Sequence, residues 1–250
     1  MICDQNFLRN CNFNVNYNPT KLFSILLKHQ PEFNKVFPFN EKKDKLLQLN
    51  FTTSNRELTA EILNDTNKFS AYISDKISKA NCKYGIGGYA EHRTIYDRSD
   101  HFDAALPGEE RRRLHLGIDI WGEAGTAVIA PIDGIVHSFA FNNNFGDYGA
   151  TIILSHSLDG IVFHTLYGHL SLNSLKNISK GDLIKAGTVF AEFGMQFENG
   201  HWPPHLHFQI IADMQGWKGD YPGVCKYSER ETYLNNCPDP DFIIQMNRFK

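Results

Sequence analysis

Histidine and aspartate residues recur in two short segments of this chain at spacings that suit a bound metal ion. One segment runs from His115 to Asp119, and the other contains His205 and His207. A catalytic zinc takes three protein ligands, drawn from His, Cys and carboxylate side chains, and leaves one position for water. His115, Asp119 and one of the two later histidines would supply these three ligands.

The segment around the first two candidates alternates between apolar and other residues, which is typical of a β-strand. Within residues 113–120, His115, Gly117 and Asp119 share one parity, and leucine and isoleucine occupy the other. Successive side chains of a strand point to opposite faces, so the two candidate ligands are expected on one face. Gly117 between them leaves room for an ion or a substrate. The same alternation places the two later histidines together.

A third segment, residues 163–171, adds one more histidine to the candidate site. His169 shares its parity with Thr165 and Tyr167, whereas His164 falls on the other. Five polar site candidates therefore come from three separated strands.

In this order, the three motifs resemble those of the lysostaphin-type (LytM-like) zinc metallopeptidases, most of which cut peptide crosslinks in bacterial cell walls. Segments 125–136 and 180–187 resemble two further family segments, and the resemblance extends from about Gly85 to Ile211. It is specific because an ordered combination of short motifs is much rarer by chance than any one of them.

The resemblance implies a role for each site residue. His115, Asp119 and His207 become the ligands of one zinc ion per chain, and His169 and His205 become a catalytic pair that does not bind the metal. It further implies a zinc-activated water that hydrolyses peptide bonds. Residues 200–204 depart from the family pattern, which puts the usual substrate contacts in doubt.

A closer resemblance involves residues 84–89, 148–156, 199–207 and 220–224. These segments are similar to the peptidase-like middle part of some large proteins. There, the part lies between a kinase-like region and a pyridoxal-phosphate aminotransferase-like region. Proteins of this kind are not obviously cell-wall enzymes.

Three further residues are expected to line a substrate groove, namely Arg93, Tyr148 and Trp202. For the two aromatic residues, simple packing in the core is the competing interpretation. The remaining histidines are expected to be structural or exposed, because only spacing with suitable partners distinguishes a catalytic histidine. They are His29, His92, His101, His137, His156 and His164, with His201 less certain.

Charge and composition argue against two classes of partner. The net charge is −3 and the pI is about 6.4, which disfavours a dedicated nucleic-acid binder. The basic residues 111–113 follow two glutamates and are expected in a solvated loop. The sequence contains no run of about 18 apolar residues, so no membrane-spanning helix is expected. Without a recognisable secretory leader the expected location is the cytoplasm, unless export follows another route.

Pattern analysis predicts a mainly β protein, with an antiparallel sandwich or barrel-like metallopeptidase core and a small helical N-terminal region, α+β overall. Residues 1–83 form a mostly helical cap, 84–215 the β domain and 216–250 an irregular extension. Residues 21–28 predict a short helix, and a capping box from Ser54 to Glu57 predicts a longer helix ending near Lys79. The five cysteines predict free thiols, with a bridge between Cys225 and Cys237 left open.

Three functional hypotheses remain. The first is a zinc endopeptidase or amidase acting on peptidoglycan-like or other short crosslinked peptides. The second is a zinc-binding recognition or regulatory module without hydrolytic activity. The third, a lipoyl- or biotinyl-type carrier, is disfavoured because Lys176 and Lys180 lack the required hairpin setting. Whether the N-terminal region packs as a cap or restricts access to the zinc, and the oligomeric state, stay open.

Overall fold

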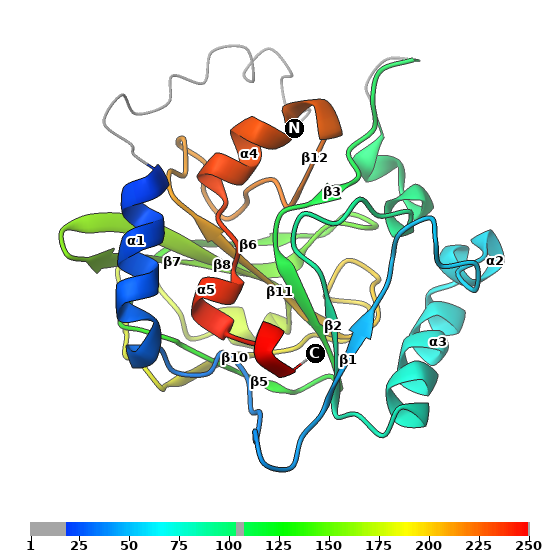
Figure 1. Cartoon of the computed structure of the whole chain (residues 1–250), viewed down its shortest axis with the longest axis horizontal. Helices are drawn as coiled ribbons and strands as arrows, with labels where there is room; N and C mark the ends of the chain where they lie inside the picture. Colours follow the sequence, from blue (N-terminus) through cyan, green and yellow to red (C-terminus); the bar gives the residue numbers. More distant parts are fainter. Residues whose placement is uncertain (1–18, 104–107, 250) are drawn as a thin grey trace.

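One large open β-sheet organises the protein (Figure 1). The computed structural model describes residues 19–103 and 108–249. Eight strands form the sheet in the order β1-β2-β4-β11-β8-β7-β6-β9, and all neighbours are antiparallel except the β1–β2 pair. The strands are β1 (Leu46–Leu49), β2 (Tyr84–Gly87), β4 (Ile118–Trp121), β6 (Gly134–Asn142), β7 (Gly149–Leu158), β8 (Ile161–Leu170), β9 (Leu183–Ile184) and β11 (His205–Ile211).

The mainly β class is confirmed, but the large sheet does not close on itself as a barrel would. Strands β1 and β9 form its two edges. Two small antiparallel sheets accompany it, one pairing β5 (Ala127–Ile129) with β10 (Val189–Glu192) and the other pairing β3 (Leu114–His115) with β12 (Val224–Cys225). The edge strand β1 belongs to the N-terminal region, so that region contributes to the sheet as well as covering it.

Helices pack around the sheet rather than forming a separate layer. Helix α1 (Pro19–His29) confirms the short helix expected over residues 21–28, and its Leu22 and Leu26 enter the main core. The C-terminal residues, expected to be irregular, instead contain β12 and the short helices α4 (Arg230–Asn236) and α5 (Asp241–Ile244). Ile243 and Ile244 of α5 are buried in the same core, which explains why this segment is ordered.

The long helix expected after Ser54 was placed wrongly. Two helices occur instead, α2 (Ala60–Asn64) and α3 (Thr66–Lys79), and Asp65 caps the second by accepting from the amides of Asn67 and Lys68 at 2.9 and 3.1 Å. The Ser54 hydroxyl instead accepts a hydrogen bond of 2.8 Å from the side-chain Nδ2 of Asn50, in a turn before the helices. An aspartate carboxylate at the N-cap satisfies free amides and also suits the helix dipole.

Cys82, Cys225 and Cys237 are free thiols, so the bridge between the last two is not formed; Cys3 and Cys11 lie outside the described residues. Arg113 is buried between Asp97 and Asp103 instead of lying in a solvated loop. Within the described ranges, no helix has the length and apolarity needed to cross a membrane.

The Asp65 cap can be tested by Asp65→Ala. We expect this change to lower the free energy of unfolding by about 1 kcal/mol, because two amides at the start of α3 lose their acceptor. Asp75→Ala is the matched control, since Asp75 lies exposed on the same helix with only a surface ion pair to Lys79. Urea unfolding measures both, and equal effects of the two changes would contradict the assigned cap.

Candidate metal centre and active-site pocket

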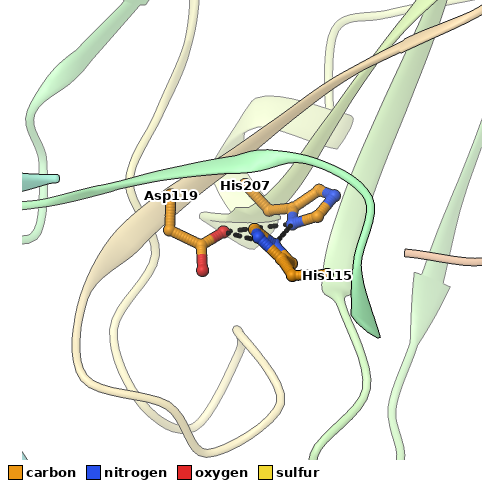
Figure 2. Close-up of side chains that lie close together, drawn as sticks. All are labelled: His115, Asp119 and His207. Carbon is orange, nitrogen blue, oxygen red and sulfur yellow. Dashed lines mark hydrogen bonds and ion pairs between the residues drawn. The ribbon is translucent and has the colours of Figure 1, made fainter. Parts of the chain in front are cut away.

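Three side chains, from β3, β4 and β11, point toward one another (Figure 2). The ligand atoms are His115 Nε2, Asp119 Oδ1 and His207 Nδ1. The two nitrogens lie 3.0 Å apart, and the carboxylate oxygen lies 3.2 Å from the first and 3.0 Å from the second. Zinc–ligand distances near 2.0 Å in a tetrahedral site imply ligand separations of about 3.3 Å, so this triangle fits a zinc ion.

Hydrogen bonds on the far side of each imidazole fix which nitrogen faces the centre of the triangle. His115 Nδ1 lies 3.1 Å from the carbonyl oxygen of Gly88, to which it can only donate. His207 Nε2 lies 2.9 Å from Gln209 Oε1, and the amide nitrogen of that glutamine donates to the Pro222 carbonyl. Both inward nitrogens therefore carry lone pairs. Such outer hydrogen bonds orient metal-binding histidines.

The charge states of these groups also favour a cation. Burial lowers the pKa of His115 to about 3, so its ring is neutral at neutral pH. Burial alone would raise the pKa of Asp119, but contacts with His115 and with the Arg93 guanidinium outweigh it and hold that pKa well below its usual value. A carboxylate and two imidazole lone pairs converge without a proton between them, which is a donor set for a metal ion.

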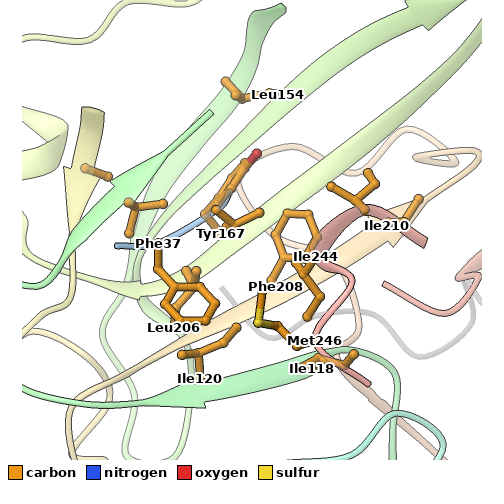
Figure 3. Packing of buried hydrophobic residues seen from close by; sticks show 14 of the residues in the cluster. Phe37, Ile118, Ile120, Leu154, Tyr167, Leu206, Phe208, Ile210, Ile244 and Met246 are labelled. Atoms are coloured by element: carbon orange, nitrogen blue, oxygen red, sulfur yellow. The ribbon is translucent and has the colours of Figure 1, made fainter. Parts of the chain in front are cut away.

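Strand geometry accounts for the positions of the ligands. On β11, Leu206, Phe208 and Ile210 pack into the apolar core (Figure 3), and the alternate residues face the site. The expected single strand over residues 113–120 is interrupted, since β3 pairs with β12 and β4 pairs with β11. Gly117 lies at this interruption, and a β-carbon there would come within 2.6 Å of His207 Nε2. The room expected beside Gly117 is thus occupied by the ligand imidazole.

Arg93, expected to line the groove, lies behind the metal ligands instead. Its side chain is 0% exposed and does not line the pocket. Nη1 donates to Asp119 Oδ2 at 2.5 Å, and Nε donates to Glu91 Oε2 at 2.7 Å. The sequence interpretation of Arg93 was wrong because the strand pairing turns this residue toward the buried carboxylate. A buried guanidinium requires such partners.

His169 and His205 lie beside the ligand triangle. Their ring centroids are 4.0 Å apart, and the His205 ring stacks on Trp121 at 3.9 Å. His169 Nδ1 lies 2.8 Å from the Asn199 carbonyl oxygen and His205 Nδ1 lies 2.8 Å from that of Pro203. Each Nδ1 therefore carries the proton, which leaves Nε2 of each neutral ring as a base.

The environment keeps both of these histidines uncharged. Burial lowers the pKa of His205 to about 4 and that of His169 well below its ordinary value. His169 also has a positive φ of 61°, an uncommon conformation for a residue with a side chain. Backbone strain of this kind persists only where surrounding contacts enforce it, here the Asn199 bond and the ring of His205.

A pocket of about 220 Å³ opens beside the triangle. Asp119, His207, His169 and His205 line it, and so do Tyr148 and Trp202; that these two aromatic residues contact substrate stays a prediction. The Tyr148 hydroxyl lies 3.4 Å from His207 Nε2. The pocket thus brings together two of the three proposed metal ligands, the second pair of histidines and two of the three residues expected in the groove.

Sequence reasoning missed several residues of this site. His101, expected to be structural, lines the pocket together with Arg112, Asp147 and Asp220. Gln209, which orients His207, shares the strand parity of the two histidines before it, and that parity could have revealed it. By contrast, His156 is structural as expected, bonded within the core to the Asp133 carbonyl and the Thr165 hydroxyl.

Part of this chain matches the model of a known protein family. Residues 113–219 match peptidase family M23. All five histidine and aspartate positions of the site lie inside this M23 segment, which covers less than half of the chain. The match supports the lysostaphin-type resemblance for this segment. The wider context of kinase and aminotransferase fusion proteins stays a prediction.

Curated relatives agree with the M23 match. A protein of Haemophilus influenzae described as an uncharacterized metalloprotease is 36% identical over 105 residues, which are 42% of this chain and 20% of the relative. The DD-carboxypeptidase/endopeptidase Mpg of Neisseria meningitidis is 34% identical over 131 residues, 52% of this chain and 28% of that protein. This chain therefore spans less than a third of the length of these relatives.

The solved structures that match this chain include two peptidases. The catalytic domain of lysostaphin from Staphylococcus simulans is 22% identical, with a TM-score of 0.37, covering 67% of this chain and 98% of that domain. A zinc-containing peptidase from Vibrio cholerae is 28% identical, with a TM-score of 0.32, covering 44% of this chain and 30% of that one. TM-scores this low carry no argument about the fold, which is defined by the strand pairing described above.

Asp220 in the pocket gives a prediction for stability. Burial, and next the charge of Asp147, raise the pKa of Asp220 to about 6, so the folded state binds a proton more tightly than the unfolded chain. The ionised carboxylate therefore costs stability above pH 6, and the cost declines as pH falls from 6 toward 4. Asp220→Asn should raise the free energy of unfolding by roughly 1–3 kcal/mol at pH 7.5 and by about half as much at pH 5.

Urea unfolding at the two pH values measures this difference. Asp75→Asn, the same change at an exposed position, is the control and should alter stability little at either pH. A gain at Asp220 that is equal at both pH values would show that the raised pKa is not its cause.

Proposed function

We propose that this chain is a zinc metallopeptidase that hydrolyses peptide bonds in peptidoglycan crosslinks or similar short peptides. The observation that carries the proposal is the convergence of three lone-pair atoms next to a pocket that two neutral histidines line. The M23 match and the relatives described as a metalloprotease and as a DD-carboxypeptidase/endopeptidase support it. His115, Asp119 and His207 would hold the zinc, which supplies Lewis acidity and an activated water when bound.

The second pair of histidines would handle protons. Nε2 of His169 or of His205 can accept a proton from the attacking water, because each Nδ1 already holds its own proton against a backbone carbonyl. The protonated ring can then donate to the departing amine. Stacking on Trp121 restrains the His205 ring, while the Asn199 carbonyl restrains His169. Fixed orientation of both bases is what an efficient proton transfer requires.

The pocket can also bind and orient a peptide. Tyr148 and Trp202 form apolar walls close to the metal ligands, and the Tyr148 hydroxyl can donate to an oxygen that develops negative charge. Burial raises the pKa of this hydroxyl well above its ordinary value, so it keeps its proton. The hydroxyl is therefore available as a hydrogen-bond donor to a bound peptide.

Zinc binding is tested first. Asp119→Ala should abolish stoichiometric zinc, and Gln209→Leu should weaken zinc affinity by about 10- to 100-fold, because His207 loses the acceptor that orients it. Elemental analysis gives the zinc content, and competition with a chelator gives the affinity. Asp159→Ala, at an exposed carboxylate, is the control. Full zinc content in Asp119→Ala would overturn the assignment of that ligand.

Hydrolysis is tested with purified peptidoglycan and, separately, with a mixed pool of cytosolic peptides, using mass spectrometry to identify products. His169→Asn suits the positive φ of this position and should lower the rate at least 100-fold while zinc stays bound. His201→Asn is the matched control, because His201 is exposed and also has a positive φ, of 66°. Stoichiometric zinc without products from either pool would instead favour a non-hydrolytic binding module.

A further inference from the structure

Arg98 is a buried cation that lacks the partners usual for such a group. Arg98 is only 7% exposed. Among the described residues, no carboxylate lies within ion-pair distance of its guanidinium. Nη2 donates to Thr66 Oγ1 at 2.8 Å, but Nε and Nη1 have no acceptor. Burial lowers the pKa of Arg98 to about 10, so the group remains charged at neutral pH. A charge buried in this way is costly unless another contact offsets it.

Three aromatic rings provide that contact. The guanidinium carbon lies 4.7 Å from the ring centroid of Trp202, 4.9 Å from that of Phe145 and 5.5 Å from that of Phe69. Each distance is within the range of a cation–π interaction, which strengthens when the cation is desolvated. The nitrogens without acceptors are shielded from solvent although Arg98 borders a cavity of about 470 Å³. Their burial argues against a dissolved anion as the missing partner.

Trp202 connects this cluster with the pocket. Its indole lines the pocket, with ring centroids of His169 and His205 at 6.3 and 6.4 Å. Its backbone N–H and carbonyl are both bonded to the side chain of Asn199, whose own carbonyl accepts from His169. A displacement of the indole would therefore reach the pocket wall and the loop that orients His169.

Helix α3 supports the same loop from the other side. Thr66 Oγ1 donates to the His201 carbonyl at 3.2 Å, and Gln196 Nε2 donates to Ser70 Oγ at 2.6 Å. Phe69, which is fully buried, packs against Trp202 at 6.4 Å and against Trp121 at 6.1 Å. The helix thus contacts both indoles that border the two catalytic histidines proposed above.

We propose that Arg98 is a positioning residue that holds Trp202 as the wall of the pocket, with Thr66 of α3 fixing the guanidinium. Both residues lie outside the M23 segment. Helix α3 then acts as a support of the active-site wall through Thr66. The effect on catalysis rests on the proposed peptidase function, whereas the effect on Trp202 does not.

The test compares Arg98→Met with Arg98→Lys in the full chain loaded with zinc. Indole N–H resonances in a ¹⁵N correlation spectrum report the tryptophans, and Trp202→Phe identifies the resonance of Trp202. We expect Arg98→Met to shift or broaden this resonance while leaving that of Trp217 in place, and Arg98→Lys to have a smaller effect because the charge remains. KM for the cleaved substrate should rise several-fold in Arg98→Met, with zinc content unchanged.

A second pair of variants keeps the proposal testable should Arg98→Met fold poorly. Thr66→Val removes the hydroxyl that contacts Arg98 and the His201 carbonyl, and Thr66→Ser retains it. Thr66→Val should move the Trp202 resonance in the same direction, and Thr66→Ser should restore it. Arg56→Met is the control, because Arg56 is exposed and borders the same cavity.

The outcomes separate the two proposals. A Trp202 resonance that stays in place in both Arg98→Met and Thr66→Val would overturn the positioning role, whatever the enzymatic activity. A shifted resonance with unchanged KM would also overturn it, since the position of the Trp202 indole would then have no effect on substrate binding. A shifted resonance in a protein that cleaves no substrate would support the positioning of Trp202 by Arg98 and contradict only the proposed peptidase function.

Discussion

The carboxylate of Asp119 is the contact on which the rest of the site depends. Oδ1 faces His115 and His207, and Oδ2 accepts from Arg93. Because Arg93 occupies the second oxygen, only one is available to a metal. The three side chains proposed as zinc ligands would then leave a coordination position for water, which distinguishes a catalytic zinc site from a closed structural one. Arg93 also keeps the carboxylate ionised within a fully buried environment.

Backbone carbonyls provide most of the orientation in this site. His115, His169 and His205 each place Nδ1 against a main-chain oxygen, belonging to Gly88, Asn199 and Pro203 respectively. Only His207 relies on a side chain, that of Gln209. Main-chain acceptors are indifferent to residue type, so the geometry of the three loops, and not their side chains, determines which nitrogen of each ring is the base.

Sequence periodicity predicted which residues of a strand share a face, although it did not predict the interruption of the strand over residues 113–120. Alternation along β11 separates the polar site from the core, and it held for His205 and His207. It could not predict the role of Arg93, because strand pairing between distant segments decides which buried partner a side chain reaches. Nor could it place the start of α3, because the Ser54 hydroxyl bonds within a turn and Asp65, which the sequence analysis did not single out, caps the helix.

The site extends well beyond the segment that matches family M23. Trp202 belongs to that segment, yet its indole lies between the pocket and a layer built from Phe69 and Arg98, which precede it in the chain. The strand β12 and Asp220 close the pocket from the C-terminal side. A buried cation held by aromatic faces leaves the carboxylates of the pocket free of an additional ion pair. Arg98 can therefore support the pocket wall through Trp202 without pairing with a pocket carboxylate, whereas Arg93, which also precedes the M23 segment, pairs with Asp119.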